Sequence, residues 1–273
     1  MKTPHKLCAL FLAALFAFTS VLAPSADVLV NPYVFEVAGG GGSTAGADAT
    51  DFDGSSDYLR HTDNTGWSAS KLVTGSLWFK RGRSGQIERV YGIQDAGSTR
   101  FAINFNADDT ILLFGRLNAT TTVLNASSAT TITDTNWHHL LFSVDLSSTS
   151  LRHVYIDDAA ETMTWTTYAN TNITFNPSNQ QHEVAHSNVG GFFFDGALSE
   201  VWLNPTTYID FSVEANRRKF ITSGGIPEEV GTDGSTPTGT APIDYLPDGQ
   251  TQAGTGAAYA VTGTPTAVDG PNP

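Results

Sequence analysis

Cysteine is almost missing from this sequence, since Cys8 is the one example among 273 residues. A chain with one cysteine cannot form an intrachain disulfide, so its fold must rely on a hydrophobic core. Charged residues make up only 15% of the chain, whereas hydrophobic residues make up 40%. That apolar supply suffices for one sizeable core and argues against disorder of the whole chain.

Positive charge is also scarce. The chain has 14 Lys and Arg residues against 27 Asp and Glu residues, which gives a formal net charge of −13. Such an acidic surface repels phosphate backbones and anionic lipids, so nucleic acid and membrane surfaces are disfavoured as partners. Neutral polymers such as glycans remain open as partners, and the many aspartates leave Ca²⁺ open as a cofactor.

Helix-forming patterns are few. One short helix is expected over residues 212–221, where Ser212 can cap the first turn and basic residues lie near the end. Elsewhere apolar and polar residues alternate with a period of two between Gly-containing turns, which predicts strands. The expected strands include residues 58–60, 75–80, 89–94, 101–105, 111–117, 138–146, 152–156 and 192–203. Many short strands with almost no helix indicate a β-sandwich.

The clearest strand, residues 138–146, has two distinct faces. Its apolar face carries Leu140, Phe142, Val144 and Leu146. We expect this face to lie in the core, because alternate residues of a strand point to the same side.

Residues 1–26 have the features of a secretory signal. Lys2 and Lys6 precede an uncharged apolar run over residues 7–23, and small residues follow. Cleavage after Ser25 is expected, which makes the mature protein secreted and free of a membrane segment. The alternatives are an uncleaved membrane anchor and an apolar plug in an assembly.

The rest of the chain divides into three parts by composition. Residues 27–50 form a Gly-rich linker, since four consecutive glycines occupy positions 39–42. The strand pattern fills residues 51–225, the expected domain. Residues 226–273 are rich in Gly, Pro and Thr but contain strand-like pieces at 242–246 and 257–261. We expect an extended arm that packs in part on the domain.

Four segments in order resemble the laminin G-like, concanavalin A-like lectin and glucanase superfamily. They are FDGSSDYL at residues 52–59, SLWFK at 76–80, the hairpin over 136–157, and FDGALSEVW at 194–202. The resemblance implies a two-sheet antiparallel jelly-roll sandwich. Residues 29–35 and 230–239 are also similar to segments of phage-encoded laminin G-like proteins, which are associated with virions or tails.

The resemblance also covers glycan hydrolases, so the sequence bears on catalysis through the patterns that it contains or lacks. Those enzymes use paired carboxylates on one strand face, commonly Glu-x-Asp-x-x-Glu, and no such pattern surrounds Glu200 or occurs elsewhere. The Gly-x-Ser-x-Gly pattern of a serine nucleophile is absent too. The sequence therefore predicts a protein that is not an enzyme.

Glycan binding would use exposed aromatic rings beside polar side chains. Trp165, with Tyr168 and Asn170 close by, is the first candidate, and Trp67 is the second. These aromatic residues lie in polar, loop-like segments, and we expect the segment with Trp165 at a sheet rim. The alternative is that these rings pack against the edge of the core.

Calcium, where bound, would take loop aspartates as ligands. Asp95 and Asp109 are the candidates, although no EF-hand spacing is present. The alternative is that both are solvated turn residues, since Asp favours turns.

Three functions follow from these observations. The first is a non-catalytic recognition module that binds a glycan or surface polymer, secreted or displayed on a particle. The second is a structural or decoration protein of a phage-like virion or tail. The third is a glycoside hydrolase of the same fold.

Overall fold

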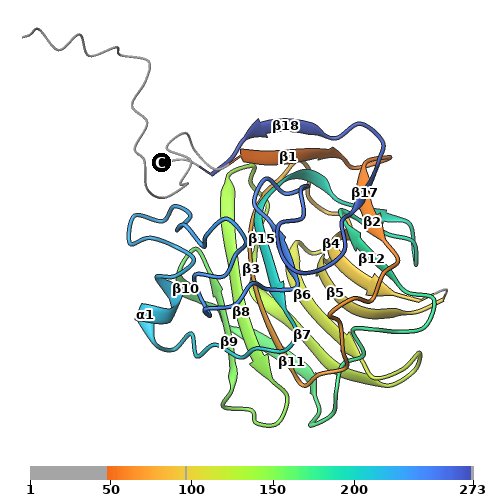
Figure 1. The fold of residues 1–273 in the computed structure, drawn as a ribbon, viewed down its shortest axis with the longest axis vertical. Coiled ribbons are helices and arrows are strands. Elements are labelled where there is room, and N and C mark those ends of the chain that lie inside the picture. Colours follow the sequence, from red (N-terminus) through yellow and green to blue (C-terminus); the bar gives the residue numbers. More distant parts are fainter. Residues whose placement is uncertain (1–47, 96, 272–273) are drawn as a thin grey trace, which may run out of the picture. The chain divides into compact units, whose positions relative to one another are not determined.

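Residues 48–95 and 97–271 are described by a computed structural model. They form two antiparallel sheets of eight strands each and a separate two-stranded hairpin (Figure 1). The expected all-β jelly-roll sandwich is confirmed. The signal-like segment and residues 27–47 of the expected linker lie outside the described residues.

The first sheet, sheet A, holds both chain-terminal strands of the described domain. In spatial order it contains β10 (Ala159–Ala160), β9 (Arg152–Ile156), β8 (Trp137–Asp145), β3 (Leu72–Arg81), β15 (Asp195–Asn204), β1 (Asp48–Asp53) and β18 (Thr266–Asp269). An eighth strand, β16 (Asp244–Leu246), also pairs with β15.

The second sheet, sheet B, carries most of the middle of the chain. In spatial order it contains β11 (Met163–Tyr168), β7 (Thr122–Thr131), β6 (Thr110–Arg116), β5 (Thr99–Phe105), β4 (Glu88–Gln94), β12 (Gln181–Val184), β2 (Tyr58–His61) and β17 (Ala260–Thr262). The hairpin of β13 (His186–Ser187) and β14 (Phe192–Phe193) follows β12.

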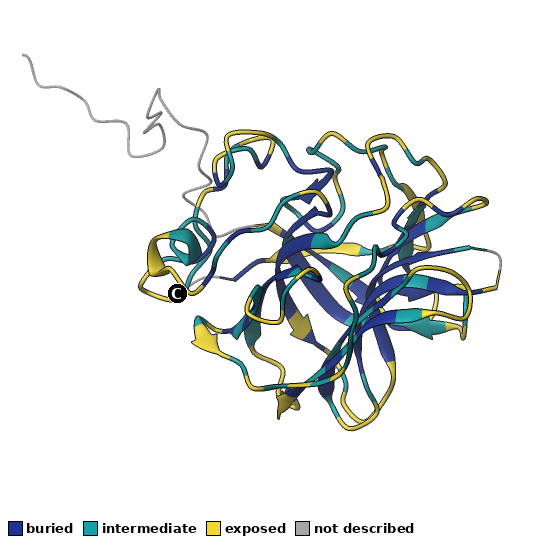
Figure 2. Cartoon of the chain, turned by 90° about the horizontal axis from the view of Figure 1, so that it is seen from below, coloured by how far each residue is buried: buried dark blue, intermediate teal, exposed yellow. Residues whose placement is uncertain are grey.

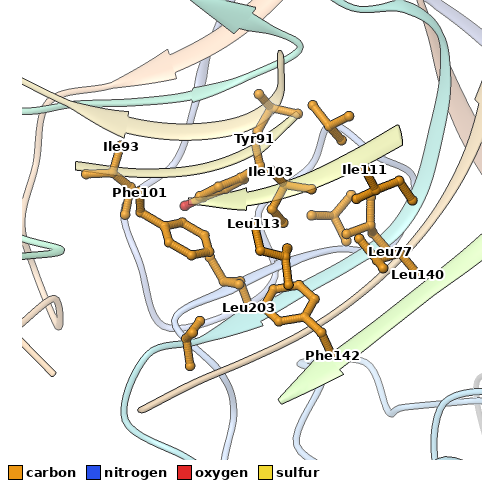
Figure 3. Close-up of a cluster of buried hydrophobic side chains, with 14 of the residues drawn as sticks. Leu77, Tyr91, Ile93, Phe101, Ile103, Ile111, Leu113, Leu140, Phe142 and Leu203 are labelled. Carbon is orange, nitrogen blue, oxygen red and sulfur yellow. The ribbon is translucent and has the colours of Figure 1, made fainter. Parts of the chain in front are cut away.

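The main core lies between the two sheets. Figure 3 shows how side chains from both sheets meet there, including Phe101 and Ile103 of β5 and Leu140 and Phe142 of β8. Alternate residues of each strand point inward, and the inward side chains are almost completely buried. The predicted apolar face of residues 138–146 is therefore the core face.

A second apolar cluster lies on the other side of sheet A. Its members are Leu141, Trp202, Ile209, Phe211, Phe220, Val230 and Tyr245. Leu141 and Trp202 belong to sheet A, and the others come from the segment that follows β15. That segment covers the part of the outer face of sheet A that carries Leu141 and Trp202. Figure 2 shows the buried strands inside and the exposed residues gathered in loops.

Three boundaries differ from the sequence expectations. The helix α1 contains only Glu214–Arg217, and its N-cap is Val213, which makes no side-chain capping bond, and not Ser212. β1 begins at Asp48, within the stretch expected as linker. Residues after 225 contribute β16, β17 and β18 to the two sheets, so they belong to the sandwich. No helix within 48–95 and 97–271 has the length and apolar character of a membrane span.

Candidate functional site

The outer face of sheet B bears a cavity of about 350 Å³ over strands β4, β5 and β6. We call it the sheet B groove. Its floor comes from these strands, and the β13–β14 hairpin supplies one wall. The groove is lined by Arg89, Gly97, Ser98, Thr99, Ala102, Asn104, Leu112, Phe114, Arg116, Val189, Gly190 and Phe192.

The strand register explains which side chains form the floor. Arg89 of β4 lies opposite Asn104 of β5, and Asn104 lies opposite Leu112 of β6. Their neighbours Ile103 and Leu113 point the other way into the core. The period-two alternation therefore turns Arg89 and Asn104 toward the groove together with apolar residues such as Leu112.

Arg89 is buried at this floor. Its side chain has room because position 92 is a glycine, where an added Cβ would lie 2.7 Å from Arg89 Nη1. Only 3% of Arg89 is exposed, and its Nη2 donates a hydrogen bond of 3.3 Å to Thr99 Oγ1. Nε and Nη1 have no partner among the described residues. Burial lowers the pKa of Arg89 to about 10, so the group remains charged at neutral pH.

Other groove residues offer both apolar and polar contacts. The half-buried rings of Phe114 and Phe192 come from β6 and β14. Arg116 places its guanidinium 4.8 Å from the centre of the Phe114 ring and donates to Ser98 Oγ. Asn104 Oδ1 accepts no hydrogen bond within the described part of the chain. Aromatic faces beside unused polar atoms are suited to a sugar.

Trp165 and Tyr168, two of the predicted binding residues, lie together at the edge of the sandwich. They are on the edge strand β11, with ring centres 5.3 Å apart in an edge-to-face arrangement. Both rings are partly buried against the core, and the Arg152 guanidinium lies 4.5 Å from the Trp165 ring centre. Tyr168 Oη donates to the Asp145 carbonyl at 2.8 Å. Asn170 follows them and is exposed.

Trp67, the fourth predicted binding residue, is inside the main core. Only 4% of it is exposed, and its ring lies 4.6 Å from the His182 ring. The expectation of an exposed ring at this position is therefore wrong. The polar neighbours that suggested a loop surface surround a residue that faces inward.

The two aspartates expected to hold calcium do not meet. Asp95 follows the last residue of β4, whereas Asp109 precedes β6 beside the first residues of β4. Asp95 forms an ion pair with Arg100, and Asp109 Oδ1 accepts from Arg81 Nη1 at 2.8 Å. Among the residues that the structure describes, no group of three or more His, Cys, Asp or Glu side chains could hold a metal. The two aspartates therefore lie apart, and calcium binding by either one stays a prediction.

Sequence reasoning missed the groove. Asn104 is a polar residue within an alternating strand, so its outward direction could be read from the pattern. The sequence pattern could not predict which residues lie next to Asn104, because strand order in a jelly roll is set by pairing between distant segments. Phe192 and Phe114 line the same groove for the same reason, since pairing between distant segments brings their strands together.

Comparisons with known proteins agree with this architecture. Residues 53–207 match the family model described as the concanavalin A-like lectin/glucanases superfamily. No curated protein matches the chain. A solved structure of a carbohydrate binding protein, described as putative, from Bacteroides ovatus is 13% identical, with a TM-score of 0.56. The match covers 82% of this chain and 60% of that one.

Two further solved structures are similar over smaller parts of the chain. The SAP-like pentraxin of Limulus polyphemus is 14% identical with a TM-score of 0.45, and the match covers 60% of this chain and 78% of that one. Domains LG4–5 of the mouse laminin alpha1 chain are also 14% identical, with a TM-score of 0.41. That match covers 61% of this chain and 43% of the other.

Proposed function

Because the chain belongs to the concanavalin A-like lectin/glucanase superfamily, we propose that it is a non-catalytic recognition module that binds a glycan in the sheet B groove. One observation carries the proposal. The groove places two aromatic rings, Phe114 and Phe192, beside polar atoms that no described residue uses. The fold shared with the Bacteroides ovatus protein is consistent with this role.

The chemistry of the groove suits a sugar ring. The apolar C–H face of a sugar packs against an aromatic ring, while its hydroxyl groups need both donors and acceptors. Asn104 Oδ1 is an acceptor, and Arg89 Nε and Nη1 are donors, that no described residue uses, and all three atoms are buried. Both sit at the floor, where they would orient a sugar held against Phe114.

The groove also supports a role without catalysis. Glycan hydrolysis needs two carboxyl groups flanking the bond that breaks. None of the described residues that line the groove is Asp or Glu. Glu183, the acid whose charge acts on Arg89, is fully buried and held by Arg60. Superfamily members include glucanases, but this groove lacks their acid pair.

We place the module outside the cell or on the surface of a particle. The support is the apolar leader over residues 1–26, which has the composition of a secretory signal. N-terminal sequencing of exported protein tests this placement, because a mature protein that begins near Ala26 is expected. Exported protein that still begins at Met1 would contradict it.

A glycan array tests the proposed function. We expect the wild-type chain to bind a subset of glycans and Phe114→Ala to weaken that binding about tenfold or more, since it removes the stacking surface. Thr166→Ala, an exposed change on β11, is the matched control and should bind normally. Absence of binding to every glycan, or equal binding by both variants, would contradict the proposal.

A further inference from the structure

The sheet B groove has a charge opposite to that of the chain. The protein carries 27 acidic and 14 basic residues. The groove nevertheless holds two arginines, Arg89 and Arg116, and no acidic residue among its described lining. Neither arginine forms an ion pair with a described residue, and the same holds for Arg152 over Trp165. The other arginines of the described chain are paired with acidic side chains: Arg60, Arg81, Arg83, Arg100, Arg217 and Arg218.

The isolation of Arg89 is costly for the fold. A buried charge without a partner destabilises the folded state, because protein contacts do not replace its lost hydration. Glu183 cannot serve as its partner, since its carboxylate already accepts bonds from Arg60 Nε, Gln94 and the Asn188 amide. No described residue therefore supplies an acceptor for Arg89 Nε or Nη1.

We propose that the groove selects glycans that carry an anionic group, a carboxylate or a sulfate, and that Arg89 pairs with this group. The inference rests on the proposed function, since it names the class of glycan that the same groove takes. The planar guanidinium matches the oxygens of such a group. Only 3% of Arg89 is exposed, so the pair would form in surroundings of low dielectric, where charges attract more strongly.

Two other groove residues, Arg116 and Asn104, would also contact an anionic glycan. Arg116 lies nearer the rim over Phe114, where it would draw the anion in and bind it less tightly than Arg89. Asn104 Oδ1 would accept a sugar hydroxyl beside the anionic group. The overall negative charge of the chain would repel the same ligands elsewhere on the surface, which confines their binding to the groove.

The test measures binding to matched pairs of probes by calorimetry. One pair is an oligogalacturonate and its carboxyl-reduced counterpart, and the other is dextran sulfate and dextran. We expect the wild-type chain to bind at least one anionic probe about tenfold to a hundredfold more tightly than its neutral partner. Added salt should weaken the preferred binding. The preferred pair tells whether carboxylate or sulfate is the recognised group.

Variants connect the preference to Arg89. Arg89→Met should remove the preference while the melting temperature stays the same or rises, because an unpaired buried charge is gone. Arg89→Lys should keep part of the preference. Arg152→Met is the matched control, since Arg152 lies over Trp165 away from the groove lining, and this variant should keep the full preference.

The outcomes separate the two proposals. Equal binding of anionic and neutral probes, or a preference that survives in Arg89→Met, would overturn the anionic class and leave glycan binding intact. Absence of binding to all four probes and to the glycan array would overturn glycan binding itself. If Arg89→Met does not fold, Arg89→Lys and the salt dependence of the wild-type chain decide the question.

Discussion

Single residues decide where the large side chains of this protein can go. Gly92 makes room for Arg89 on the outer side of sheet B, and Gly75 makes room for Phe142 on the inner side of sheet A. A Cβ at position 75 would lie 2.5 Å from the Phe142 ring. Such close approaches leave little space for adjustment, so changes at these positions alter packing directly.

Phe142→Ala should be strongly destabilising. Phe142 is 1% exposed and lies in the main core, where its ring packs closely on Gly75. We expect the free energy of unfolding to fall by about 3–5 kcal/mol, measured by denaturant titration. A loss below about 1 kcal/mol would show that the ring does not pack as described.

Trp165→Ala distinguishes a structural ring from a ligand platform. Because Trp165 packs on Tyr168 and Arg152 at the sandwich edge, the change should lower the free energy of unfolding by about 2 kcal/mol. Glycan binding at the sheet B groove should remain. Unchanged stability together with lost glycan binding would restore Trp165 as the platform.

At the scale of elements, local pattern predicted some strands and missed others. β9 was predictable at its observed bounds, because Val154 and Ile156 alternate with polar residues between two turns. β7 was missed because its sequence, TVLNASSATT, is mostly small and polar. It is a strand through its pairing with β6 and β11. Tertiary pairing overrides weak local preference in such cases.

Two truncations test how the late strands contribute. A chain that stops after Tyr259 loses only β17 and β18, whose residues are all exposed, so we expect a stability loss of about 1–2 kcal/mol. A chain that stops after Gly225 also loses Tyr245 and Leu246 and uncovers Trp202. It should lose at least about 5 kcal/mol and fail to fold.

Circular dichroism and thermal melting check both truncations. The chain ending at Tyr259 is the control for the shorter one, since it keeps Tyr259 Oη bonded to Asp244 at 2.6 Å. A stable, cooperatively melting chain that ends at Gly225 would show that the later residues are a dispensable arm.

The whole molecule should respond to acid through its buried histidines. His139 is fully buried against Trp78, and burial lowers its pKa to about 3. Burial likewise lowers the pKa of His61 and of His182, which stack with ring centres 4.5 Å apart. His139 is neutral in the folded protein near pH 6, and the lowered pKa values of His61 and His182 favour their neutral forms, whereas the unfolded chain takes up protons below about pH 6.5.

Above pH 6.5 these histidines therefore do not lower the free energy of unfolding. Below pH 6.5 the free energy of unfolding falls by about 1.4 kcal/mol per pH unit for each histidine that stays neutral in the folded protein. Burial raises the pKa of Glu200 to about 7, which acts in the opposite sense between pH 4.5 and 7. Comparison with His139→Asn isolates the histidine effect, because both proteins keep Glu200. Denaturant titrations from pH 7 to 5 should show a less steep decline for the variant, and parallel declines would contradict the assignment.

The edge of sheet A also sets how the domain would respond to mechanical force. β1 and β18 are antiparallel, with Asp48 opposite Asp269 at the outer end of the pair. Tension applied through these two ends would load the hydrogen bonds one at a time, as in the opening of a zipper. In an optical trap, we expect β18 to peel from β1 at low force, before the rest of the sandwich yields.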